Sequence, residues 1–248
     1  MPFRSLCALA CAGLVRAAAA SADSSSLDLE ARIEYGYFTE DGRTLETLAN
    51  ASAQADKPDG IKSYYAGLAG YRLTLLDFSR DSGAARSAAE KCVSSLDRAL
   101  DAGPTPAAAE ALALQSACLE LESQLGALRS PFAGTKSKSQ MQKALKAGPR
   151  NPRVLLLDAV SAVERAANRA DSDRALGRLK KAIAALENER QEVVHAPAWG
   201  LADAYTRLGR FFLDRGDTVA ARDALEHALL LAPEFQQARR LMTKITSG

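Results

Sequence analysis

The stretch from Ala202 to Phe235, ADAYTRLGRFFLDRGDTVAARDALEHALLLAPEF, decides the fold of this chain. Near its end, Ala228 is followed five residues later by Pro233. An alanine close to a helix end lets a neighbouring helix approach, and a proline just beyond it stops the helix because proline cannot continue the backbone hydrogen bonding. The stretch therefore predicts a helix that packs closely on a neighbour and then ends.

The same spacing from alanine to proline recurs along the chain. The pairs are Ala53/Pro58, Ala99/Pro104, Ala144/Pro149 and Ala228/Pro233. Successive prolines are 46, 45 and 84 residues apart, and the last gap equals two steps of 42. A chain that stops a helix at a near-constant interval stacks copies of one helical unit. We therefore expect an all-α protein built from helix hairpins.

The quoted stretch resembles the tetratricopeptide repeat at ten positions. They are Tyr205, Leu208, Gly209, Phe212, Gly216, Asp217, Ala221, Leu225, Ala228 and Pro233. Gly209 and Ala221 are small enough for two antiparallel helices to approach, and Gly216 permits a tight turn. The resemblance implies a right-handed superhelical stack, or solenoid, of about five antiparallel hairpins. The other units keep only part of the pattern, and their period of 38 to 46 residues exceeds the 34 typical of the family. The alternative is a helical bundle with one accidental match.

Turn signals place the expected elements. We expect hairpins over about 26–57, 58–103, 104–148, 150–188 and 197–233, followed by a capping helix over 234–246. The third hairpin contains a stretch rich in Gly, Ser and Lys over 126–139, which favours a loose loop and restricts its second helix to about 140–147. In the fourth hairpin, Glu187 stands where the spacing would place a proline.

Residues 1–22 have the composition of a signal peptide. Arg4 precedes an alanine-rich apolar run, and small residues allow cleavage after Ala22, so we expect a periplasmic or secreted protein. Arg16 interrupts the run, which leaves a cytoplasmic protein with an apolar leader as the alternative. Cys11 lies in a degenerate lipoprotein site, and we expect membrane association only if it is lipidated.

Composition indicates a folded helical protein, and overall charge gives no reason to expect a nucleic-acid partner. Hydrophobic residues make up 47% of the chain, which suits a folded protein, and aromatic residues only 6%, which suits closely packed helices. Removal of the leader takes away Arg4 and Arg16 and leaves 30 basic against 30 acidic residues. No overall charge then favours nucleic acid, so we expect no nucleic-acid partner.

The segment between Glu122 and Asp158 has no acidic residue and is locally basic. Its candidate patch consists of Lys136, Lys138, Lys143, Lys146 and Arg150. One interpretation is a surface for an anionic lipid or glycan, and the other is a solvated helix face.

Cys92 and Cys118 are each 13 residues from Thr105, at the turn between two expected hairpins. They are therefore expected at similar height on adjacent antiparallel helices. A disulfide in an oxidising compartment is one interpretation, and two buried thiols are the other.

The resemblance implies that the first helix of each repeat lines a concave groove that holds a peptide or a partner helix. The groove candidates are Asp203, Thr206, Arg210, Leu213 and Asp214 in the last repeat, with Arg153 and Leu156 in the fourth. Trp199, Tyr64 and Tyr65 are expected in the core rather than as exposed anchors.

No catalytic or metal-binding constellation emerges from the sequence. His195 and His227 are isolated, and Glu192 with His195 lacks the second such pair that a di-metal bundle site needs. We therefore expect no cofactor and no enzyme activity. The expected function is an interaction scaffold of the cell envelope or secreted space that binds a protein or peptide in its groove. The alternative is an envelope factor that binds anionic lipid or glycan through residues 129–153.

Overall fold

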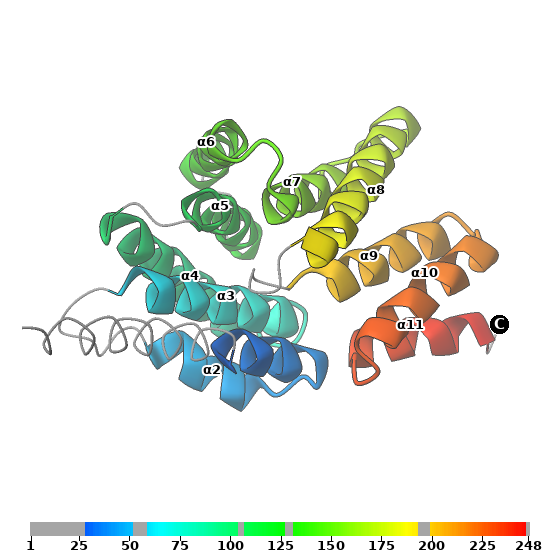
Figure 1. Cartoon of the computed structure of the whole chain (residues 1–248), viewed down its shortest axis with the longest axis horizontal. Helices are drawn as coiled ribbons and strands as arrows, with labels where there is room; N and C mark the ends of the chain where they lie inside the picture. The colour runs from blue at the N-terminus through cyan, green and yellow to red at the C-terminus, as the bar shows by residue number, and fades with distance from the viewer. Residues whose placement is uncertain (1–27, 52–58, 104–106, 127–130, 193–198, 247–248) are drawn as a thin grey trace, which may run out of the picture.

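The computed structural model describes residues 28–51, 59–103, 107–126, 131–192 and 199–246. Within these ranges the chain is helical and contains no strand, as the sequence predicts (Figure 1). Residues 28–38 are helical and precede the labelled helices. These are α2 (Gly42–Asn50), α3 (Gly60–Asp77), α4 (Ser82–Asp101), α5 (Ala108–Leu125), α6 (Pro131–Ala147), α7 (Pro152–Glu164), α8 (Arg169–Glu192), α9 (Leu201–Asp214), α10 (Thr218–Leu231) and α11 (Gln236–Thr246).

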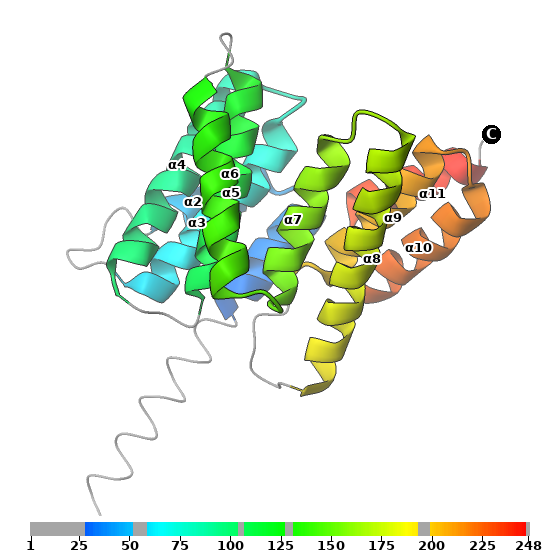
Figure 2. The same ribbon diagram turned by 90° about the horizontal axis from the view of Figure 1, so that it is seen from above.

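Neighbouring helices pack on one another in sequence order. Helices α3 and α4, α5 and α6, α7 and α8, and α9 and α10 form four pairs, and α3, α5 and α7 also contact one another in that order (Figure 2). Asp side chains cap the starts of several helices: Asp81, for example, accepts hydrogen bonds from the backbone of Gly83 and Ala84. Pro152 occupies the first turn of α7, where its missing N–H costs nothing.

Small residues set the spacing within the pairs. A Cβ placed on Gly209 would lie 2.6 Å from Cγ of Leu225, so α9 and α10 approach as the sequence predicts. A Cβ on Gly67 would lie equally close to Leu96, which gives α3 and α4 the same glycine-to-leucine contact. Gly216, between α9 and α10, has a φ of 77° that favours glycine.

Two helix boundaries differ from the prediction. Helix α6 begins at Pro131, so most of the stretch expected to be a loose loop is helical. Tertiary contacts explain this, because Ser137 and Gln140 are buried against α5 and Ser116 donates a hydrogen bond to the Ser137 carbonyl at 2.8 Å. Helix α8 runs past 188 to Glu192, consistent with Glu187 replacing the expected proline.

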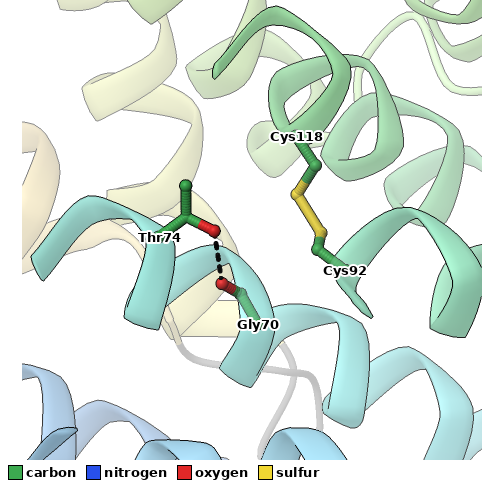
Figure 3. Close-up of a disulfide and its surroundings, with 4 residues drawn as sticks. All are labelled: Gly70, Thr74, Cys92 and Cys118. Atoms are coloured by element: carbon green, nitrogen blue, oxygen red, sulfur yellow. Dashed lines mark hydrogen bonds between the residues drawn. A yellow bond between two sulfur atoms is a disulfide. The ribbon is translucent and has the colours of Figure 1, made fainter. Parts of the chain in front are cut away.

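Cys92 on α4 and Cys118 on α5 form a disulfide, with the two Sγ atoms 1.97 Å apart (Figure 3). Both side chains are fully buried. Helix α3 packs beside the bond, because a Cβ on Gly70 would lie 3.1 Å from the backbone of Cys92. One covalent link thus joins two successive helix pairs.

The two ends of the helical array contact each other. The ring of Phe235, just before α11, lies 4.5 Å from that of Phe38 and 5.5 Å from that of Tyr37, centroid to centroid. Glu40 forms ion pairs with Arg240 on α11 and with Arg80 after α3. The helices therefore surround a central space, and α11 does more than cap the last pair. The predicted leader and the first alanine-to-proline pair lie outside the described residues.

Candidate functional site

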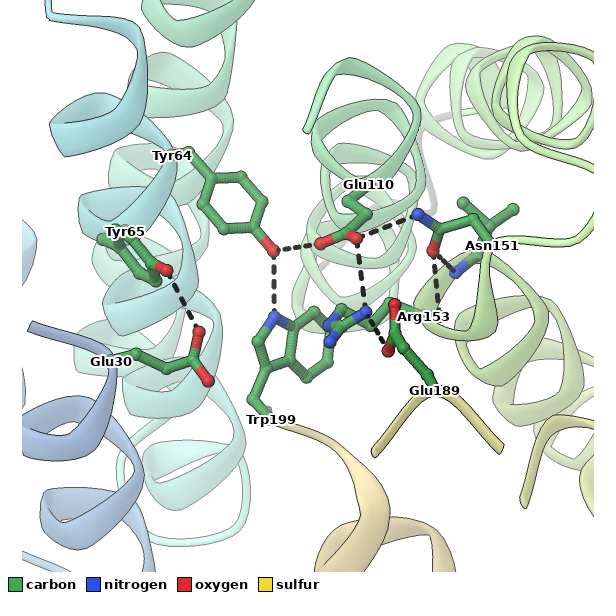
Figure 4. A network of polar contacts seen from close by, with 9 residues as sticks. Glu30, Tyr64, Tyr65, Glu110, Asn151, Arg153, Glu189 and Trp199 are labelled. Carbon is green, nitrogen blue, oxygen red and sulfur yellow. Dashed lines mark hydrogen bonds and ion pairs between the residues drawn. The ribbon is translucent and has the colours of Figure 1, made fainter. Parts of the chain in front are cut away.

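The N-terminal halves of α5, α7 and α9 and the part of α3 from Tyr64 to Arg72 meet around Trp199, and their inward-facing side chains fill the space between them. We call this region the filled half. Trp199 Nε1 donates a hydrogen bond to the Tyr64 hydroxyl at 2.9 Å, and that hydroxyl donates to Glu110 at 2.8 Å (Figure 4). Glu110 also accepts from Asn151 at 2.9 Å. Arg153 forms ion pairs with Glu110 at 3.4 Å and with Glu189 at 2.8 Å. One connected network thus links four helices.

A second set of buried charges lies beside Trp199. Arg72 is fully buried and donates to both carboxylate oxygens of Glu34, at 2.9 and 3.0 Å, and to Asp203 at 3.3 Å. Arg207 donates to the same oxygen of Asp203 at 3.2 Å. Burial alone would raise the pKa of Asp203, but Arg207 and Arg72 outweigh it and lower the pKa. The four charges alternate in sign and neutralise one another, as buried ions require.

The C-terminal halves of the same first helices enclose a cleft of about 440 Å³. We call this region the open half. Its lining comes from α3, α5, α7, α9, α11 and the end of the helical residues 28–38. The apolar and aromatic members are Tyr37, Tyr71, Leu75, Leu76, Phe78, Ala117, Leu121, Leu157, Val160 and Phe235. A smaller cavity of about 200 Å³ lies between α7, α8 and α9 and shares Arg207 and Arg210 with the cleft.

The charges around the cleft are largely paired within the protein. Glu40 is held by Arg80 and Arg240, and Glu120 pairs with Arg165 at 2.7 Å. Glu164 lines the cleft, is exposed, and has no ion pair with another described residue. The cleft therefore combines an apolar wall with a polar rim of nearly balanced charge, a lining typical of ligand-binding sites.

Four of the seven groove candidates are buried in the structure. Asp203, Thr206, Arg153 and Leu156 are buried, because Trp199 and the ion networks fill the half of the inner face to which these positions belong. Thr206 borders only the smaller cavity. A site on the surface of a groove needs exposed side chains, so these four residues do not form one.

The other three candidates differ in which cavity they border. Arg210 is exposed and lines both cavities, and Asp214 lines the smaller one. The carboxylate of Asp214 lies 4.0 Å from Nε of Arg210. Leu213 is half-buried and packs against the core. Arg210 is thus the one candidate that borders the larger cleft.

Sequence reasoning missed the residues at the base of the cleft: Tyr37, Tyr71 and Arg207. Tyr37 reaches the cleft only because the first described helix lies next to α11. Arg207 follows the predicted groove position Thr206 by one residue, so a repeat-based assignment passes over it. No local sequence signal reports either contact.

The basic patch is exposed as expected. Lys136, Lys138, Lys143 and Lys146 lie on the solvent side of α6, and Arg150 is exposed just after it. None of them forms an ion pair with a described residue. The patch is on the outside of the helix array, away from the residues that line the cleft.

The remaining predicted sites give mixed results. Trp199, Tyr64 and Tyr65 are buried, as expected. His227 is exposed and stacks on Tyr205 with ring centroids 5.0 Å apart. The side chains of Glu192 and His195 are outside the described residues.

The described residues contain no candidate metal-binding group and no candidate membrane-spanning helix. No group of three or more His, Cys, Asp or Glu side chains in these ranges is placed to hold a metal ion. Among the described helices, none combines the length and apolar character that a bilayer-spanning segment requires. A comparison of the chain with models of known protein families finds no match, and a comparison with curated proteins finds none either.

Proposed function

We propose that this protein is a non-enzymatic interaction protein that binds a segment of a partner protein in the open half of its inner face. The observation that carries the proposal is the 440 Å³ cleft, which the first helices of successive pairs enclose with an apolar wall and a charged rim. A cleft of this size and lining is typical of ligand recognition. We also propose, on the resemblance of residues 202–235, that the pairs form a tetratricopeptide-like solenoid in an exported protein.

The close glycine-to-leucine contacts support the solenoid part of the proposal. Gly209 and Leu225 belong to the orthodox repeat, and Gly67 with Leu96 repeats the contact in a unit whose sequence has diverged. The helices α3 and α4 are longer than α9 and α10, which fits a lengthened repeat. The disulfide between Cys92 and Cys118 fits the oxidising compartment that the predicted leader implies.

A crosslinking capture from the native cell with the mature chain tests the proposal. We expect Arg210→Glu to abolish the capture of a discrete protein, because Arg210 borders both cavities. A charge reversal of Lys136, Lys138 and Lys143 should leave that capture intact. Capture that survives Arg210→Glu would contradict the proposal.

A second candidate function rests on the unpaired lysines of α6. Five exposed cations that form no ion pair with a described residue would attract an anionic lipid or glycan, with an interaction that weakens as salt screens it. If the charge reversal on α6 abolishes binding to anionic vesicles and Arg210→Glu does not reduce any capture, this second function replaces the first.

A further inference from the structure

Three residues that line the cleft carry hydrogen-bond donors without a partner among the described residues. Arg207 uses its Nε for Asp203, and its two terminal amino groups make no hydrogen bond to a described side chain or carbonyl. The hydroxyl groups of Tyr37 and Tyr71 make none either, although both rings are buried. None of these atoms is a fully buried polar atom that lacks a partner, so each is accessible to solvent. Because all three residues line the cleft, the atoms open on it. Donors that lack a partner favour a ligand that supplies acceptors.

Tyr37, Tyr71 and Arg207 all line the cleft, so the three side chains border one space. Burial raises the pKa of Tyr37 and of Tyr71, and Arg207 contributes in the opposite direction to both. Both phenols therefore stay protonated at neutral pH and can donate. A guanidinium that offers two amino groups beside two hydroxyl donors matches the two oxygens of a carboxylate.

The surrounding charge favours a single negative charge over a double one. Asp203 lies behind Arg207 and already offsets part of its charge, and Glu164 is the acid of the cleft lining without an ion pair. A phosphate with about two negative charges would face both acids, with Arg207 at the base of the site and Arg210 elsewhere in the lining to offset them. A carboxylate fits this balance better.

The walls define what carries the carboxylate. Leu76, Leu121, Leu157 and Val160 line the cleft above the donors, so the attached group is apolar. The contact of residues 37–40 with Phe235 and α11 lies beside the cleft, and Arg207 also borders the smaller cavity. A chain end with an apolar last residue supplies a carboxylate together with an apolar group, which matches these donors and walls.

We propose that the base of the cleft, formed by Arg207, Tyr37 and Tyr71, binds the C-terminal carboxylate of a partner protein whose last side chain is apolar. This inference rests on the proposed function and adds the chemical class of the bound segment. It also explains why Arg207 keeps two amino groups free while its Nε is committed to Asp203.

The test uses two pools of N-acetylated hexapeptides with identical sequences that end in Leu, Ile, Val or Phe. One pool has a free C-terminal carboxylate and the other a C-terminal amide. Calorimetric or fluorescence titration of the full mature chain should show at least tenfold tighter binding of the free-acid pool. Equal binding of the two pools, or binding of neither, would overturn the inference.

Conservative variants link that binding to the cleft. Tyr37→Phe and Tyr71→Phe each remove one hydroxyl and should each weaken the free-acid pool about tenfold, the effect of losing a hydrogen bond to a charged group. Tyr35→Phe is the matched control, because Tyr35 is 61% exposed and outside the cleft. Arg207→Lys keeps the positive charge but loses the planar set of N–H donors. The circular-dichroism spectrum and melting curve of this variant check that the fold still tolerates the buried Asp203.

Two outcomes separate this inference from the proposed function. Hexanoate that binds as tightly as the free-acid pool would assign the site to a small organic acid and overturn the chain-end assignment. A partner captured through Arg210 whose binding ignores both Tyr→Phe variants would leave the proposed function standing and overturn this inference alone.

Discussion

The filled half and the open half of the inner face are built from the same helices, yet they differ in what occupies the space between them. In the filled half, Trp199 and two ion networks occupy it, and Arg72 and Arg153 are almost completely buried. In the open half the same helices leave a cleft of about 440 Å³. One end of each helix therefore stabilises the array, and the other end is left available for a ligand.

The buried charges of the filled half fix the arrangement of the helices more than they add to stability. A buried ion pair adds little net stability, because the cost of removing two charges from water offsets their attraction, but removal of one partner is expensive. The alternating chain of Glu34, Arg72, Asp203 and Arg207 thus ties the first described helix, α3 and α9 into one arrangement. That arrangement holds Arg207 at the base of the cleft.

The largest effect is expected from Arg72→Met. The change leaves the buried carboxylates of Glu34 and Asp203 without their shared cation, and we expect it to lower the free energy of unfolding by about 3–5 kcal/mol. Urea denaturation at pH 7 measures this. Arg210→Met, in the open half, is the control and should change stability by about 0.5 kcal/mol or less. Similar effects of the two changes would remove the distinction between the halves.

The second largest effect on stability is expected from removal of the disulfide between Cys92 and Cys118. Replacement of Cys92 and Cys118 by alanine should lower the free energy of unfolding by about 2–4 kcal/mol, because the disulfide restricts the unfolded chain across a separation of 26 residues. Urea denaturation of the variant against the oxidised protein tests this. If the loss is real but the cleft keeps its ligand affinity, the bond supports the whole array rather than the site. An unchanged denaturation midpoint would mean that the bond contributes no stability.

A smaller effect is expected from pH, and it too belongs to the filled half. The pKa of Asp203 is lowered in the fold, so its contribution to stability is fully present above its unfolded pKa of about 3.9 and is lost as pH falls through the folded value. The difference in unfolding free energy between the native protein and Asp203→Asn should therefore shrink between pH 7 and pH 3. A difference that stays constant over this range would show that the pKa of Asp203 is not lowered in the fold.

The smallest effect on stability, and the largest on binding, is expected from Ser161→Trp. Ser161 lines the cleft and is half-buried, so an indole there fills space that the fold leaves open. We expect the free energy of unfolding to change by about 0.5 kcal/mol or less and partner capture to disappear. Ser139→Trp is the matched control on the exposed side of α6. Loss of capture with both variants would point to a general defect.

Local features of the sequence predict the elements well. Pro152 marks the start of α7, Gly216 marks the turn between α9 and α10, and the spacing of Cys92 and Cys118 places them at the same height. Each of these features depends on residues close in sequence or on a simple count along two helices. The burial of Trp199 and Tyr64 follows from their position among apolar neighbours in the same way.

The site itself depends on contacts that no local pattern specifies. The ion pair of Glu40 with Arg240 spans 200 residues, and that of Arg72 with Asp203 spans 131. The resemblance to the tetratricopeptide repeat predicts that Asp203 and Arg153 face inward. It cannot show that Trp199 and distant charges fill that part of the face, so residues expected to contact a ligand are instead buried.

Site-specific photo-crosslinking tests the central claim most directly. A benzophenone side chain in place of Gln124, which lines the cleft, is compared in living cells with one in place of Gln142, which is exposed on α6. We predict a discrete protein adduct from position 124 that disappears when Ser161→Trp is added, and none from position 142. Adducts from position 142 alone, or an adduct at position 124 that survives Ser161→Trp, would contradict the assignment of binding to the open half.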